Sequence, residues 1–337
     1  MTGRAATLAT GPGRRERAWV SAAAFALAAG LLGAVNAAVA RPMLLAERFL
    51  PGAGWAEVAA LAVYAAAVSG VLLDPRRRAR WRLRLWLAFS AVFFGQLVLG
   101  LAGVERLLMT GALHPPVPAV ILAGPIYRGG GVFMLALFGA TLLLAGPAWC
   151  SYLCYLGAWD GALAARRRHP TPLPAWSGRG RIALLAAVVS AACLLNLAGV
   201  GAGAAAGLAL AFGAGGVATM ALASRRRGTM IHCAVYCPLG LVADVLGKVS
   251  PFRIRIGDGC TECGACAAAC RYGALPQAAI RRRRPGLTCS LCGDCEGACA
   301  TGQIGFGLSR RPRRWVRGLF VALVSAAHAT FLGVARM

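Results

Sequence analysis

Residues 260–270 read CTECGACAAAC, and residues 289–299 read CSLCGDCEGAC. Both stretches space their cysteines as C-x2-C-x2-C-x3-C, so eight of the 13 cysteines lie in two equal runs. Glycines in and beside the runs, at 259, 264, 293 and 297, allow a tight loop around the first three thiols. The fourth thiol of each run lies further along the chain and ties the two halves together.

This spacing predicts two [4Fe–4S] clusters in a small module of the bacterial two-cluster ferredoxin type. In that arrangement each cluster takes three cysteines from one run and the fourth from the other. The predicted ligands of cluster 1 are Cys260, Cys263, Cys266 and Cys299, and those of cluster 2 are Cys289, Cys292, Cys295 and Cys270. Zinc is the alternative, but it usually takes two CxxC pairs. Disulfides are disfavoured by the cytoplasmic placement inferred below.

The composition around this module indicates a membrane protein. The chain has 337 residues, of which 58% are hydrophobic and only 14% are charged. A soluble protein carries about 25% charged residues, so a large soluble enzyme is excluded. Apolar runs of about 17–25 residues can cross the hydrocarbon core, and we expect seven of them. They lie at 18–40, 57–73, 85–104, 131–149, 182–200, 203–223 and 318–335. The last is short enough that lying along the membrane interface is an alternative.

The positive charges indicate the orientation. The formal net charge is +25, and 31 of the 36 basic residues fall in alternate connections, 16 of them between the sixth and seventh runs. The five on the other side are Arg41, Arg48, Arg106, Arg128 and Arg336. By the positive-inside rule the basic connections are cytoplasmic. We therefore expect a bacterial inner-membrane protein with a cytoplasmic ferredoxin module and no nucleic-acid partner.

The expected fold is an all-α polytopic membrane bundle of about six to seven helices with a small α+β ferredoxin module. The N-terminal tail covers 1–17, and the transmembrane domain covers 18–249. The ferredoxin domain covers 250–308, and a basic segment with the last membrane helix covers 309–337.

Two further cysteine pairs lie where helices leave the membrane. Residues 149–157 read WCSYLCYLG and residues 232–240 read HCAVYCPLG, a Cys-x3-Cys-x-Leu-Gly pattern repeated 83 residues apart. Thiols at positions i and i+4 share one face of a helix at about 5–6 Å, wider than the ~3.8 Å between the Cβ atoms of a disulfide. Cys150, Cys154, Cys233 and Cys237 thus predict a redox or metal site, holding a third cluster or copper. Simple packing of small cysteines at helix ends is the alternative.

Other residues give weaker indications. A membrane haem needs axial histidines at membrane depth, and only His328 fits, so no haem is expected. His232 is expected to be a solvated interfacial residue. The basic run 281–284 is expected to favour a reduced cluster or to attract an acidic redox partner; contact with anionic lipid headgroups is the alternative.

Two Cys-x3-Cys motifs followed by a two-cluster module resemble the NapH-type membrane polyferredoxin family. They are also similar to the C-terminal half of the nitrous-oxide reductase maturation protein and to a cytochrome-oxidase assembly protein. The resemblance covers about 131–305; at the first motif Tyr155 replaces the expected proline, which stands at Pro238 in the second. It implies an inner-membrane electron-transfer protein that serves the quinone pool or a respiratory or maturation partner.

The leading expectation is therefore a membrane-bound electron-transfer protein that relays electrons through two [4Fe–4S] clusters. The alternative is a metalloenzyme assembly factor that binds or reduces copper at the membrane-edge thiols. No catalytic domain is evident, so an enzyme activity stays open.

Overall fold

The computed structural model describes residues 11–39, 42–108, 115–308 and 312–334. Seven helices in this part of the chain are long and apolar enough to cross a membrane, which confirms the expected number. They cover Arg14–Ala38, Gly54–Leu72, Pro75–Leu101, Phe133–Leu153, Ser177–Leu197, Ala202–Arg227 and Arg314–Val334. The third begins at Pro75 rather than at 85, because Asp74 caps it by accepting from the Arg76 N–H at 3.0 Å and proline suits the first turn.

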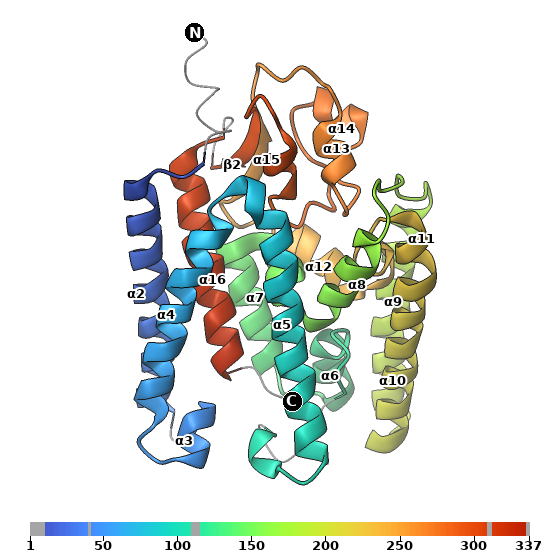
Figure 1. The fold of residues 1–337 in the computed structure, drawn as a ribbon. Helices are drawn as coiled ribbons and strands as arrows, with labels where there is room; N and C mark the ends of the chain where they lie inside the picture. Colours follow the sequence, from blue (N-terminus) through green and yellow to red (C-terminus); the bar gives the residue numbers. More distant parts are fainter. Residues whose placement is uncertain (1–10, 40–41, 109–114, 309–311, 335–337) are drawn as a thin grey trace.

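Shorter elements connect these spans (Figure 1). The long helices are α2 (Arg14–Ala38), α4 (Gly54–Leu72), α5 (Pro75–Leu101), α7 (Phe133–Ala145), α9 (Ser177–Leu197), α10 (Ala202–Thr219) and α16 (Arg314–Val334). The shorter helices are α3 (Leu45–Phe49), η1 (Glu105–Leu107), α6 (Val120–Arg128), η2 (Gly146–Ala148), η3 (Trp149–Leu153), α8 (Tyr155–Ala165), η4 (Met220–Ser224), α11 (Arg225–Arg227), η5 (His232–Tyr236) and α12 (Pro238–Leu246).

Helices α2, α4 and α16 pack closely because small residues line their contacts. Ala24 and Ala62 are fully buried there, and a Cβ on Gly318 would lie 2.4 Å from Trp19. Such close approach drives helix association in lipid, where water exclusion does not. In the most apolar window of α16, 72% of the residues are buried. The last span is therefore a central helix of the bundle, which argues against the interfacial alternative.

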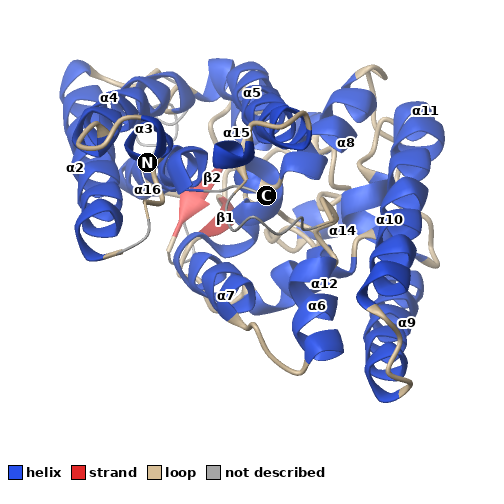
Figure 2. Cartoon of the chain, turned by 90° about the horizontal axis from the view of Figure 1, so that it is seen from below, coloured by secondary structure: helices blue, strands red, loops and turns tan. Residues whose placement is uncertain are grey.

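Helices α9 and α10 lie at the edge of the bundle, far from α2 and α4 (Figures 1 and 2). Only 11% of the residues in each of their apolar windows are buried. The turn that joins α9 to α10 is held by α6, since the Tyr127 hydroxyl donates to the Val200 carbonyl at 2.7 Å. Most of the surface of α9 and α10 can therefore contact lipid. Cys193, on α9, is one of the exposed residues.

Residues 250–308, which we call the Cys-rich module, form a small α+β unit between α12 and α16. Strands β1 (Arg253–Ile256) and β2 (Ile304–Gly307) pair antiparallel, with Ile254 opposite Phe306. Helices α13 (Ala265–Ala269) and α15 (Asp294–Ala298) contact each other, and α14 (Gln277–Arg281) lies between the two cysteine runs. The Phe306 ring stacks on Phe320 of α16 at 4.4 Å, which fixes the module on the bundle.

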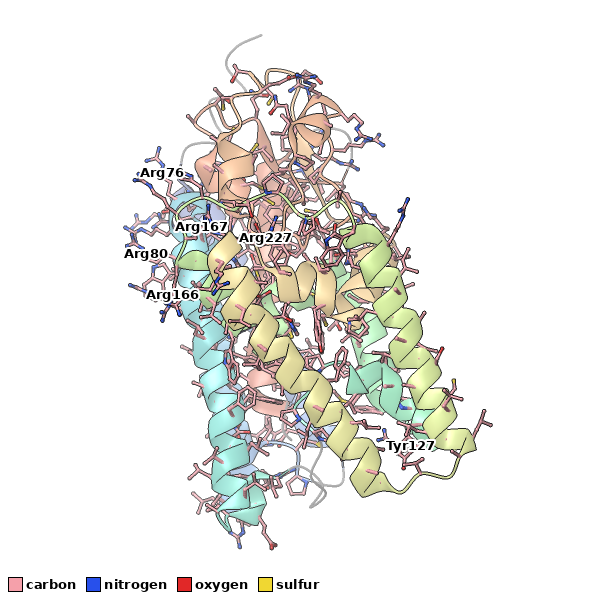
Figure 3. All side chains as sticks on the ribbon, turned by 90° about the vertical axis from the view of Figure 1, so that its right-hand side faces the viewer. Arg76, Arg80, Tyr127, Arg166, Arg167 and Arg227 are labelled. Carbon is pink, nitrogen blue, oxygen red and sulfur yellow. The ribbon has the colours of Figure 1, made fainter. Side chains whose placement is uncertain are left out.

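The Cys-rich module lies at one end of the long helices (Figure 1). Figure 3 shows Arg76, Arg80, Arg166 and Arg167 near that end, with Tyr127 towards the opposite end. The basic connections and the module therefore lie on the same side of the bundle. The assignment of that side to the cytoplasm stays a prediction of the positive-inside rule.

Candidate functional site

The first three cysteines of the first run surround one pocket together with the last cysteine of the second run. This pocket is lined by Cys260, Cys263, Cys266 and Cys299, among other residues. Glu262 (φ 58°) and Gly264 (φ 78°) turn the backbone around it. The Cys299 sulfur accepts from the Gln303 N–H at 3.3 Å. The structure thus brings together the four residues predicted to hold cluster 1.

A second pocket has the matching composition. It is lined by Cys270, Cys289, Cys292 and Cys295, the four residues predicted to hold cluster 2. Leu291 (φ 57°) and Gly293 (φ 77°) repeat the turn of the first run. The Cys270 sulfur accepts from the Ala274 N–H at 3.3 Å, as Cys299 does from Gln303. The two sites are therefore near copies, each closed by a cysteine from the other run.

Burial disfavours the thiolate form of the cysteines in both pockets. Burial raises the pKa of the Cys289 thiol to about 12. Burial also raises the pKa of Cys266 to about 11, and the charges of Cys260 and Cys299 add to this rise. All 13 cysteines are described, and none forms a disulfide. A thiolate in such surroundings needs positive charge beside it, which a bound metal ion would supply because a metal deprotonates the thiol that binds it.

Within the described residues, no three His, Cys, Asp or Glu side chains converge on one point as a single metal ion requires. A mononuclear zinc site needs four ligand atoms about 2.0–2.3 Å from the ion. In a cubane cluster each cysteine binds a different iron, so its sulfurs stand further apart. Four cysteines line each pocket, which is the ligand set that a [4Fe–4S] cluster takes.

The membrane-edge pairs have nearly identical backbone geometry. Cys150 and Cys233 lie in the π-helical turns η3 and η5, and Cys154 and Cys237 end these turns. Cys154 has φ −76° and ψ 114°, and Cys237 has φ −75° and ψ 117°. The expectation that each pair lies on a regular helix is wrong, because the Cys154 N–H bonds the Trp149 carbonyl five residues back. The two motifs are equivalent although Tyr155 replaces proline.

The glycine that ends each motif has a steric role. A Cβ on Gly157 would lie 2.5 Å from Trp86 and 3.0 Å from the Cys150 carbonyl oxygen. A Cβ on Gly240 would lie 2.5 Å from the Cys233 carbonyl oxygen. In both copies only glycine lets helices α8 and α12 begin directly against the preceding turn.

The four membrane-edge thiols share one electrostatic environment. Burial raises the pKa of Cys233, and the Asp160 carboxylate, which accepts from the Cys233 N–H at 3.0 Å, raises it further. The other three thiols of the two motifs also raise it. Burial raises the pKa of Cys154 to about 12, with Cys237 as the next cause. The structure therefore places both pairs around one region.

This region adjoins the pocket of the second cysteine run. The Tyr272 side chain lines that pocket, and its hydroxyl donates to the Cys150 carbonyl at 3.1 Å. The Tyr152 hydroxyl donates to the Cys292 carbonyl at 2.9 Å. The pocket that holds Cys292 thus faces the membrane-edge thiols, whereas Cys263 in the other pocket is exposed.

Ion pairs hold the second run on the bundle. Arg82 binds both carboxylate oxygens of Asp294, at 2.6 and 3.1 Å. Arg78 binds Glu296 at 2.6 Å, and Arg317 of α16 binds the other oxygen of Glu296 at 3.2 Å. From the sequence alone these arginines are expected only as positive charges in the connections that flank the membrane spans. The signal that could have revealed their role is the presence of two acids inside the second run, in a chain with 11 Asp and Glu residues.

Two other sequence expectations meet different outcomes. His232 is buried, not solvated, because Gly216 and Tyr236 pack against its ring. The basic run 281–284 lies beside the first pocket, where Arg283 donates to the Cys260 carbonyl at 3.3 Å. Arg281 and Arg283 each lie 3.7 Å from Glu262. This run is therefore placed to act on the exposed pocket.

Comparison with known families also indicates iron–sulfur chemistry, but through residues outside the two cysteine runs. A family model described as a 4Fe-4S binding domain matches residues 129–172 and 206–257. The matched stretches contain both Cys-x3-Cys motifs and end before Cys260. No curated protein and no solved structure matches the chain. The match supports an iron–sulfur, ferredoxin-like family and shows that the chain carries a 4Fe-4S binding domain.

Proposed function

We propose that this chain is a membrane-bound electron-transfer protein of the NapH-type polyferredoxin kind, with three sites for [4Fe–4S] clusters. Cys260, Cys263, Cys266 and Cys299 would hold the first cluster, and Cys289, Cys292, Cys295 and Cys270 the second. Cys150, Cys154, Cys233 and Cys237 would hold the third. A bound cluster of this type accepts and returns one electron. The single observation that carries the proposal is the pairing of each three-cysteine loop with the fourth cysteine of the other run.

The protein supplies a graded series of environments for this transfer. Cys263 is exposed and accessible to a soluble partner. Cys292 is held against the bundle by Tyr152, and Tyr272 spans from its pocket to Cys150. Buried surroundings and N–H donors to sulfur tune the potential of such sites. The arrangement supports transfer between a partner at the exposed pocket and an acceptor near the membrane-edge thiols.

The far end of this path is proposed to be the quinone pool or a redox partner in the bacterial inner membrane. The basic residues at the end that carries the Cys-rich module support a cytoplasmic module (Figure 3). The family match over both membrane-edge motifs favours a cluster rather than copper at those thiols.

The function is tested with anaerobically purified protein in proteoliposomes. We expect dithionite to reduce the protein and a quinone analogue to reoxidise it, followed by its visible absorbance and by paramagnetic resonance. Cys233→Ser should abolish reoxidation while leaving reduction of the Cys-rich module intact. The lipid-facing Cys193→Ser is the control and should behave as the wild type. Copper bound in place of iron and lost in Cys233→Ser would instead establish the assembly-factor alternative.

A further inference from the structure

A pocket of about 290 Å³ lies where the Cys-rich module meets the ends of α7 and α12. Pro147 and Gly247 line it from the bundle, and Phe252 and Leu291 line it from the module. Cys289, a predicted ligand of cluster 2, forms part of its wall. None of the electron-transfer roles proposed above uses this pocket.

The charged residues that line the pocket are mostly cations. They are Lys248, Arg253, Arg255 and Arg284, with Asp244 as the one carboxylate among them. Asp244 already pairs with the buried Arg181. The Arg253 guanidinium is fixed by the carbonyls of Lys248, Ser250 and Phe252. The pocket therefore carries positive charge that the lining residues do not neutralise.

Arg255 and Arg284 carry most of this excess. The Arg255 Nε atom is buried and has no hydrogen-bond partner in the described residues. Burial lowers the pKa of Arg255, and the like charges of Arg284 and Arg253 lower it further. A buried donor without a partner is destabilising, because the hydrogen bond that it loses to water is not replaced. An anion in the pocket would satisfy this donor and offset the repulsion among the arginines.

The chain segments that adjoin Pro147 and Gly247 in the pocket lining carry exposed apolar side chains, which we call the apolar rim. Leu143 and Leu144 at the end of α7 are 54% and 58% exposed, and Val245, Leu246 and Val249 after α12 are 50%, 49% and 68% exposed. The Ser250 hydroxyl donates to the Leu144 carbonyl at 3.2 Å and joins the two ends. Leu143 and Leu144 belong to the apolar span Phe133–Leu153, whereas α12 follows the sixth span and is not itself one of the seven. An apolar rim of this kind suits acyl chains and not a small soluble ion.

We propose that this pocket binds the phosphate headgroup of an anionic phospholipid, with the acyl chains along the exposed leucines and valines of the rim. Basic pockets at the cytoplasmic ends of membrane helices bind such headgroups, and arginine binds phosphate through two parallel hydrogen bonds. Arg255 and Arg284 bind the phosphate, and Lys248 lies near Asp244 at the edge. The site needs no bound cluster, so it stands apart from the proposed function.

The test uses the full chain in nanodiscs of phosphatidylcholine, with or without phosphatidylglycerol, and native mass spectrometry to count retained lipid. Wild-type protein should retain one phosphatidylglycerol, and the Arg255→Gln/Arg284→Gln variant should lose it by tenfold or more. The control is Arg281→Gln/Arg282→Gln, which removes two charges next to Arg284 in the sequence but outside the pocket lining and should retain the lipid. Arg284→Gln alone, at an exposed residue, covers the case in which the double variant fails to fold.

Two outcomes would overturn the proposal. One is equal retention of phosphatidylglycerol by the wild type and the Arg284→Gln variant. The other is binding of inorganic phosphate to the detergent-purified protein, lost in the same variant, without any retained lipid. That result would assign the pocket to a soluble phosphate ester. Retained lipid that inorganic phosphate does not displace supports the lipid site.

Discussion

The two cysteine runs share a spacing but differ in what surrounds them. Both turn at a residue with positive φ, and both close with a cysteine that accepts an N–H four residues on. The first run faces outward, with Cys263 exposed, whereas in the second Leu291 is 3% exposed and faces the bundle. The cysteines therefore set the lining of each pocket, and the residues between them decide which of the two runs packs on the bundle.

The docking residues can be read from the alignment of the two runs. Where the first has Ala265, Ala267 and Ala268, the second has Asp294, Glu296 and Gly297. The two acids bind Arg82 and Arg78 of α5, and a Cβ on Gly297 would lie 2.2 Å from the Pro75 carbonyl oxygen. Three residues that differ between the two runs therefore attach the second run to the membrane bundle.

The largest expected effect comes from Glu296→Ala. This change leaves Arg78 and Arg317 buried without their shared carboxylate, which costs about 3–5 kcal/mol. We expect the Cys-rich module to become protease-sensitive at temperatures where the bundle stays folded, measured by limited proteolysis in detergent. The counterpart is Glu262→Gln, whose ion pairs are partly exposed at 3.7 Å and worth about 0–1 kcal/mol. Equal effects of the two changes would contradict the asymmetry.

The next largest effect is expected from Arg82→Gln. It should lower the free energy of unfolding by about 1.5–3 kcal/mol, which is the range for hydrogen bonds to charged groups. It removes both bonds to Asp294 and one to the Ser151 carbonyl. Thermal unfolding followed by tryptophan fluorescence checks this value. Arg84→Gln, an exposed change on the same helix, should leave the unfolding temperature unchanged, and a matching drop there would mean that Arg82 acts only through surface charge.

Gly297→Ala tests the close approach to α5. The added methyl group must displace the Pro75 carbonyl, and overpacking of this kind costs about 1–3 kcal/mol. Alanine already occupies the equivalent position of the first run, so the matched control Ala268→Gly should cost about 1 kcal/mol or less. Hydrogen exchange of α15 would report the loosened contact, and unchanged exchange in Gly297→Ala would show that the approach is not limiting.

The smallest expected effect is that of Tyr152→Phe, which removes one hydrogen bond to the Cys292 carbonyl. Its loss should cost about 1 kcal/mol and shift the unfolding temperature slightly. Tyr127→Phe removes a similar bond at 2.7 Å far from the module. Only Tyr152→Phe should change the reduction potential of the cluster at Cys292. A potential identical to that of the wild type would show that Tyr152 does not influence that site.

The sequence predicted the parts of this structure that depend on spacing and hydropathy. The seven apolar helices are confirmed in number, and the cysteine pattern grouped the thiols as the two pockets do. The sequence does not predict the π-turns, because cysteines with three residues between them suit a regular helix as well as a turn closed by a hydrogen bond to the carbonyl five residues back. The sequence does not predict the ion pairs of Arg78 and Arg82. An arginine that forms a buried ion pair cannot be told from one in a cytoplasmic connection until its acidic partner is known.

The central claim is tested most directly by counting iron and acid-labile sulfide in anaerobically purified protein. Three cluster sites predict about twelve of each per chain, since each cluster holds four irons. The variants Cys292→Ser, Cys263→Ser and Cys233→Ser should each lose about four irons from a different site. Zinc or bare thiols in place of iron, or an iron content unchanged by all three substitutions, would contradict the account.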